Sequence, residues 1–98
     1  MKIEKQERNL IHFYKQVALI IIKSEKRYVT LRELENRFPK WKDAIFSWMQ
    51  WTDAKEWFGL GGSCRPGEGT TYTLNHQYAD FTYAEMISAM NKHYGLDQ

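Results

Sequence analysis

The spacing of apolar residues near the start of the chain predicts a long amphipathic helix over residues 1–24. Leu10, Tyr14, Val17 and Ile21 recur three or four positions apart, and neither glycine nor proline interrupts the segment. The six residues that begin with Val17 are apolar on every side of such a helix. This turn therefore needs cover all round, from another helix of the chain or from a partner subunit.

Two further helices are expected in the middle of the chain. Thr30 and Glu33 have the spacing of a capping box, in which each side chain bonds the backbone N–H group of the other residue. The box begins a short helix over residues 30–38, which Pro39 ends. A third helix is expected over residues 40–55. Its apolar face would consist of Trp41, Ala44, Ile45, Trp48 and Thr52.

Residues 57–75 have the composition of a β-hairpin. Five of the six glycines and one of the two prolines fall in this stretch, and its last residues, TTYTL, suit a strand. A very short strand, RYV at residues 27–29, precedes the second helix. A second capping box, Thr82 with Glu85, predicts a last helix over residues 82–94. Its apolar stripe would be Tyr83, Ile87, Met90 and Tyr94, with Gly95 as the C-cap.

The length and the expected elements predict one mostly helical α+β domain that spans residues 1–98. The chain is 43% hydrophobic and 15% aromatic, which suits a folded core rather than a disordered chain. Its single cysteine excludes an internal disulfide and fits a reducing compartment. The apolar run from Val17 is far shorter than the roughly 20 residues of a membrane span and lacks a signal-peptide cleavage site. We therefore expect a cytoplasmic protein without a membrane segment.

The charges are distributed unevenly along the chain. Residues 23–42 hold seven basic and three acidic residues, whereas residues 43–98 hold three basic and seven acidic ones. Most charged runs are simply solvated surface. The alternative is a basic segment that faces a polyanion such as nucleic acid.

The glycine-rich stretch does not have the residues of a catalytic or phosphate-binding loop. Gly62 and Gly67 have the spacing of a phosphate loop, but Glu68 stands where that loop needs lysine. Arg65 would favour the thiolate form of Cys64, yet no histidine is spaced to serve as its base. The cysteine and three histidines also lack metal-ligand spacing. We therefore predict no enzymatic activity, no metal and no cofactor, and interpret the stretch as a hairpin turn.

The order of the elements resembles the winged helix–turn–helix superfamily. The segments that carry the resemblance are YVTLRELENRF as the second helix, KWKDAIFSWMQW as the third, and WFGLGGSCRPGEGTTYTL as the wing. The resemblance covers about residues 3–75 and rests on element order rather than on an invariant motif. The last helix is a common kind of addition to this fold.

The resemblance implies a DNA-binding protein, such as a small transcriptional regulator. Its third helix would enter the major groove and its wing would touch the backbone or the minor groove. Groove-facing residues would then be Lys40, Lys42, Asp43, Phe46, Ser47 and Gln50. Contacts near phosphates would come from Lys26, Arg27, Thr30 and Arg32, and Arg65 would be the probe of the wing. Gln50 could bond adenine with its amide, and Phe46 could meet a thymine methyl group.

Three alternatives remain open from the sequence. Winged helices also serve as protein–protein modules, and an adaptor or inhibitor role would suit an exposed Phe46. The tryptophans could stack on single-stranded bases, although core packing explains most of them better. These are Trp41, Trp48, Trp51 and Trp57. A homodimer through the first and last helices would also double the contacts to double-stranded DNA.

Overall fold

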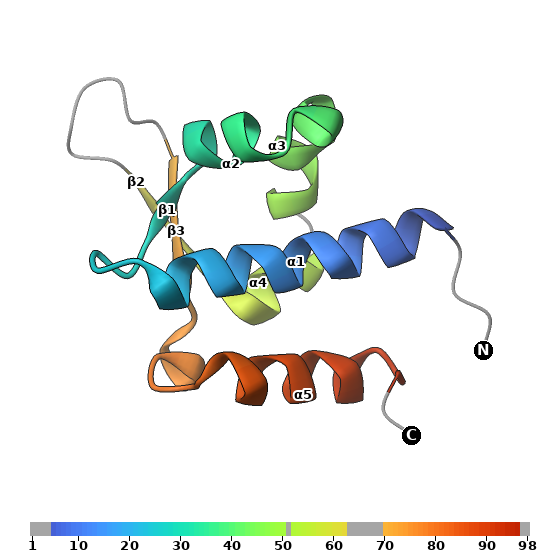
Figure 1. Ribbon diagram of the computed structural model, residues 1–98, viewed down its shortest axis with the longest axis vertical. Helices are drawn as coiled ribbons and strands as arrows, with labels where there is room; N and C mark the ends of the chain where they lie inside the picture. The colour runs from blue at the N-terminus through green and yellow to red at the C-terminus, as the bar shows by residue number, and fades with distance from the viewer. Residues whose placement is uncertain (1–4, 51, 63–69, 97–98) are drawn as a thin grey trace.

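The computed structural model describes residues 5–50, 52–62 and 70–96, which form a mostly helical α+β fold with a small antiparallel sheet at one side (Figure 1). The predicted class is therefore confirmed at this level. In chain order the elements are α1 (Lys5–Lys23), β1 (Val29–Thr30), α2 (Leu31–Arg37), a 3-10 turn (Pro39–Trp41), α3 (Lys42–Gln50), α4 (Thr52–Trp57), β2 (Phe58–Gly62), β3 (Thr70–Leu74), a second 3-10 turn (His76–Tyr78) and α5 (Tyr83–His93).

Helix α1 is the central element of the helical part. In Figure 1 it crosses the middle of the molecule, with α2 and α3 on one side and α5 on the other. Its buried residues are the four of the predicted stripe, Leu10, Tyr14, Val17 and Ile21, together with Ile11, Phe13 and Ala18. The periodicity therefore identified the buried face correctly but too narrowly, because helices cover α1 from two sides.

Strand β3 lies at the centre of the sheet, whose strand order is β1-β3-β2. Thr30 of β1 pairs with Thr71, and Gly62 of β2 pairs with Thr70. Both pairs lie at the end of β3 that follows the hairpin loop. Because β1 continues directly into α2, this register places the start of α2 beside that end of the hairpin.

The segment predicted as the third helix, residues 40–55, begins with the 3-10 turn and is followed by α3 and α4; Trp51, between these two helices, lies outside the described residues. Ile45 and Met49 of α3 are buried, and so are Ala54 and Trp57 of α4. The buried residues therefore extend beyond the predicted apolar face, of which Trp41, Ala44 and Trp48 are only half-buried.

The two ends of α5 follow the predicted signals. Both halves of the capping box are formed: the Glu85 N–H donates to Thr82 Oγ1 at 3.2 Å, and the Thr82 N–H donates to Glu85 Oε1 at 3.0 Å. Gly95 follows the helix with a φ of +70°, a left-handed conformation that favours glycine. Local side-chain chemistry therefore determines where this helix begins and ends.

The face that α5 buries differs from the predicted stripe. Met86 and Met90 are completely buried, whereas Tyr83 and Ile87 are half-buried. Met86 was missed because the face of α5 that turns inward is decided by its packing beside α1, not by its own sequence (Figure 1). The spacing of apolar residues in α5 is compatible with more than one buried face of the helix.

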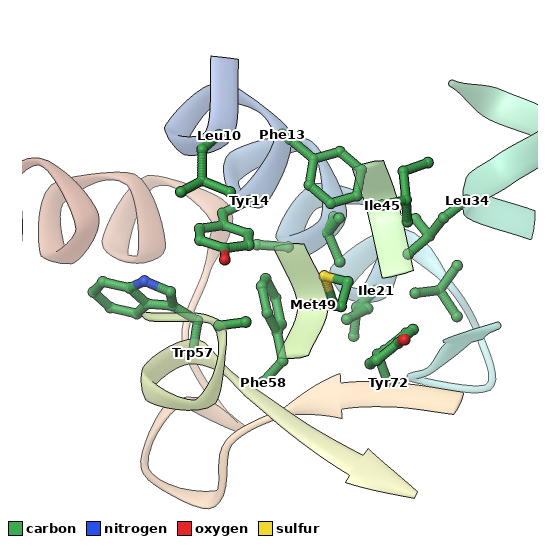
Figure 2. Close-up of a cluster of buried hydrophobic side chains, with 14 of the residues drawn as sticks. Leu10, Phe13, Tyr14, Ile21, Leu34, Ile45, Met49, Trp57, Phe58 and Tyr72 are labelled. Carbon is green, nitrogen blue, oxygen red and sulfur yellow. The ribbon is translucent and has the colours of Figure 1, made fainter. Parts of the chain in front are cut away.

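Large side chains from α1, α3, α4 and the sheet fill the core (Figure 2). Trp57 is 1% exposed, and the half-buried rings of Trp41 and Trp48 lie 6.0 and 5.4 Å from the ring of Phe13, centroid to centroid. Trp51 lies outside the described residues. The other three tryptophans are thus engaged in packing within the protein, which argues against the base-stacking alternative.

Two buried tyrosines differ in what their hydroxyl groups contact. The Tyr14 hydroxyl donates to the backbone carbonyl of Trp48 at 2.6 Å. The Tyr72 hydroxyl is also buried but has no hydrogen-bond partner among the described residues. Burial, together with the nearby negative charge of Glu35, raises the pKa of Tyr72. An unpaired buried hydroxyl loses its bonds to water without compensation.

Replacing each of these tyrosines by phenylalanine is expected to change stability in opposite directions. Tyr14→Phe removes a buried hydrogen bond, so the free energy of unfolding should fall by about 1–2 kcal/mol. Tyr72→Phe removes only an unpaired polar group, so the free energy of unfolding should rise by about 1 kcal/mol. Urea denaturation followed by tryptophan fluorescence measures both changes. A loss in Tyr72→Phe as large as that in Tyr14→Phe would contradict this account of Tyr72.

The raised pKa of Tyr72 also predicts a pH dependence. In the unfolded chain this phenol loses its proton near pH 10, whereas in the folded protein it keeps the proton to higher pH. The folded state is therefore destabilised as the pH rises above about 10. Tyr72→Phe lacks this contribution, so its stability advantage over the unmodified protein should widen from pH 8 to about pH 11. A constant difference across that range would show that Tyr72 titrates alike in both states.

Candidate nucleic-acid interface

Helix α3 has one buried and one exposed face. Ile45 and Met49 point into the core. The exposed residues are Lys42, Asp43, Phe46, Ser47 and Gln50, which are the groove-facing candidates on this helix. Phe46 is 48% exposed and is the only exposed large hydrophobic residue in the described part of the chain. The structure thus brings five candidates together on one surface, which we call the α3 face.

The α3 face is held in place from behind by aromatic side chains. The Tyr14 hydroxyl of α1 bonds the Trp48 carbonyl, and the Phe13 ring lies against the Trp48 ring. Directly before α3 in the chain, the ring of Phe38 stacks on the ring of Trp41, with 5.7 Å between the ring centroids and 23° between the ring planes. Helix α3 has only nine residues, too few to be stable alone, so these contacts determine its orientation.

The charge at the start of the α3 face is mixed. Lys40, in the 3-10 turn, and Lys42, the first residue of α3, are both exposed. The Lys40 ammonium lies 5.8 Å from the centroid of the Trp41 ring, within cation–π range. Asp43 directly follows Lys42, and a carboxylate in the first turn suits the helix dipole. The same carboxylate would repel a phosphate, so the positive charge at this end of α3 is partly offset.

Thr30 contributes to the helix cap of α2 rather than to an open surface. It is 5% exposed, and its hydroxyl accepts a bond from the Glu33 N–H at 3.1 Å. The hydroxyl also donates to the Glu33 carboxylate at 3.4 Å, and Thr30 itself pairs with Thr71 in the sheet. At the start of α5, the Glu85 carboxylate also accepts a bond from the backbone N–H of the cap residue Thr82. The described contacts at the start of α2 do not include the equivalent bond from the Thr30 N–H to Glu33. The capping box predicted at Thr30 is thus formed in one half only.

Lys26 and Arg27 lie in the turn after α1, on the other side of Figure 1 from α3. Arg27 has a φ of 64°, and its guanidinium donates to the Ile22 carbonyl in the last turn of α1 at 3.1 Å. Its side chain therefore caps α1, as a cation near a helix C-terminus does. The Lys26 ammonium lies 5.7 Å from the centroid of the Tyr28 ring. These two residues do not join the α3 face.

Arg32 and Arg65 complete the set of candidates. Arg32 is exposed in the first turn of α2, next to the strand that pairs with β3. Arg65 lies outside the described residues, as do Cys64 and Glu68 of the same loop. A continuous basic stripe that joins Arg27, Arg32, Lys42 and Arg65 would favour DNA binding. Because the Arg27 side chain is directed to the last turn of α1, it does not belong to such a stripe.

Comparison with protein-family models, with curated proteins and with solved structures gives no match to this chain. Within the described segments, no helix is long and apolar enough to cross a membrane. Across the same segments, no three histidine, cysteine, aspartate or glutamate side chains come together as metal ligands could. The chemistry of the α3 face itself must therefore support any functional proposal.

Adjacent positions on α3 allow a test of the boundary between its two faces. Ile45→Ala opens a cavity in the core and is expected to lower the free energy of unfolding by about 2–4 kcal/mol. Phe46→Ala, one residue along, should cost less than about 1 kcal/mol because half of this side chain already contacts solvent. Urea titrations of both variants measure the difference. Equal losses would mean that Phe46 belongs to the core and not to the α3 face.

Proposed function

We propose that this protein binds double-stranded DNA with the α3 face in the major groove, as a small transcriptional regulator. The observation that carries the proposal is the α3 face itself, with Lys42, Ser47 and Gln50 exposed on a helix whose other side is anchored in the core. An exposed helix with lysine, hydroxyl and amide groups offers contacts to both phosphates and base edges.

The arrangement of the elements supports a winged helix–turn–helix interpretation. Helix α1, the short strand β1, the helices α2, α3 and α4, and the antiparallel strands β2 and β3 follow one another, and the sheet order is β1-β3-β2. The end of β3 that follows the hairpin loop lies beside the start of α2. In a winged helix the loop of this hairpin is the wing, so Arg65 would contact the DNA backbone or the minor groove.

Four of the five exposed side chains of α3, and Lys40 before it, have a defined role in this proposal. Gln50 would bond an adenine with its amide oxygen and nitrogen, and Phe46 would pack on a thymine methyl group. Lys40 and Lys42 would neutralise phosphates, with Asp43 limiting the gain. Such a small number of cations makes one copy a weak binder. A homodimer through α1 and α5 would double the contacts.

A protein-binding role for the same surface is the second candidate. Phe46 is 48% exposed in the middle of the α3 face, and exposed aromatic rings are enriched where proteins bind one another. In this case Phe46→Ala would abolish binding of a protein partner, whereas removal of the lysines would have a smaller effect. The two candidates therefore predict different sensitive residues on one helix.

A salt-titrated gel-shift assay on random genomic DNA fragments tests the proposal. Retardation is expected at low salt and should fade as salt rises, because phosphate contacts release counterions. Lys42→Ala and Arg65→Ala are each expected to weaken binding about threefold or more, and to reduce the salt slope by about one unit. Sites selected from the same library then reveal a base preference, which Gln50→Ala should relax without changing the slope.

The matched control is Lys92→Ala. Lys92 is an exposed lysine near the end of α5, which lies across α1 from α3 (Figure 1). This variant should bind DNA as the unmodified protein does. No retardation at low salt, or an undiminished affinity in a Lys42→Ala/Arg65→Ala double variant, would rule out DNA binding through this surface.

A further inference from the structure

A groove of about 520 Å³ lies between α1 and α2, away from the α3 face. Leu19 and Ile20 of α1, together with Phe38 after α2, provide its apolar part. All three are only half-buried. Leu19 and Ile20 belong to the turn of α1 that is apolar on every side, and the packing of α5 beside α1 does not cover them completely.

The ends of the groove are basic. Lys23 stands in the last turn of α1, Arg37 stands in the last turn of α2, and both are exposed. Glu33 is the single acid that lines the groove, and its carboxylate accepts the hydrogen bond of the Thr30 hydroxyl at 3.4 Å. Gln16 and Ser24 complete the lining. The groove therefore combines three apolar side chains with polar ones and a net positive charge.

We propose that this groove binds an amphipathic helical segment of another protein, with apolar side chains that enter the groove and carboxylates that face Lys23 and Arg37. The charge of the groove favours an acidic partner, because complementary potential steers and orients association. Two helices that flank an open apolar groove are a recurrent way to bind a third helix. This role is independent of DNA binding, because it uses none of the exposed residues of α3.

The shape of the groove favours a peptide over a small ligand. Sites for small molecules enclose most of the surface of the ligand, whereas this groove is open to solvent along α1 and α2. Its volume accommodates more than one apolar side chain of a segment that lies across it. A nucleic acid is disfavoured because only two cations, Lys23 and Arg37, line the groove, and Leu19, Ile20 and Phe38 between them offer a phosphate no contact.

The test uses two labelled peptides of about 18 residues, long enough to form a helix when bound. Both carry leucines at helical spacing; one has glutamates beside them and the other has lysines at the same positions. Fluorescence anisotropy should show saturable binding of the acidic peptide, with the basic peptide at least about tenfold weaker. Arg37→Glu should weaken the acidic peptide at least about fivefold and strengthen the basic one. Ile20→Ser should weaken the acidic peptide without reversing the preference.

Two controls keep the result interpretable. Lys92→Glu changes the same charge on α5 and should leave both affinities unchanged. The melting temperature of each variant shows whether it is folded. If Ile20→Ser unfolds the protein, Arg37→Glu still tests the proposal, because Arg37 is exposed and its replacement leaves the core intact.

Three outcomes would overturn the proposal. The first is the absence of saturable binding up to about 1 mM peptide, which is weaker than a useful complex. The second is an equal affinity for the acidic and basic peptides. The third is a protein dimer, seen by sedimentation, that Ile20→Ser and Arg37→Glu both dissociate, because the occupant of the groove would then be a second copy of this chain.

Discussion

The position of α3 depends on a partly buried hydrogen bond to α1 and on the core contacts beside it. The Tyr14 hydroxyl, completely buried on α1, donates to the carbonyl of Trp48 in the last turn of α3. Ile45 and Met49 enter the same core beside this bond. A helix of nine residues thus takes its orientation, and the direction of its exposed face, from α1.

The other side of α1 and the sheet are fixed by similar contacts. The Lys15 ammonium reaches across to Asn91 of α5 at 2.6 Å, and partial burial lowers the pKa of Lys15. The Asn75 amide, directly after β3, donates to the carbonyls of Lys55 and Glu56 in the last turn of α4 at 2.5 and 2.7 Å. Both contacts supply a polar partner where two elements meet, so the hairpin and α5 are positioned as firmly as α3.

Local signals in the sequence predicted the parts of the fold that local chemistry determines. The buried stripe of α1 and the ends of α5 follow from periodicity and capping, which depend on neighbours a few residues apart. The burial of Ala54 and of Met86 was missed, because it follows from packing against other elements and not from the periodicity of their own helices.

Only part of the candidate site could be predicted from the sequence. A net charge along a segment does not show which of its residues share a surface. The basic residues of positions 23–42 are divided by the fold between different places: Lys40 and Lys42 lie beside α3, Lys23 and Arg37 flank the α1–α2 groove, and Arg27 caps α1. The α3 face alone therefore offers DNA few cations. If the protein binds DNA as proposed, tight binding requires contacts from the hairpin or from a second copy, whereas Lys23 and Arg37 belong to the groove proposed for an acidic protein segment.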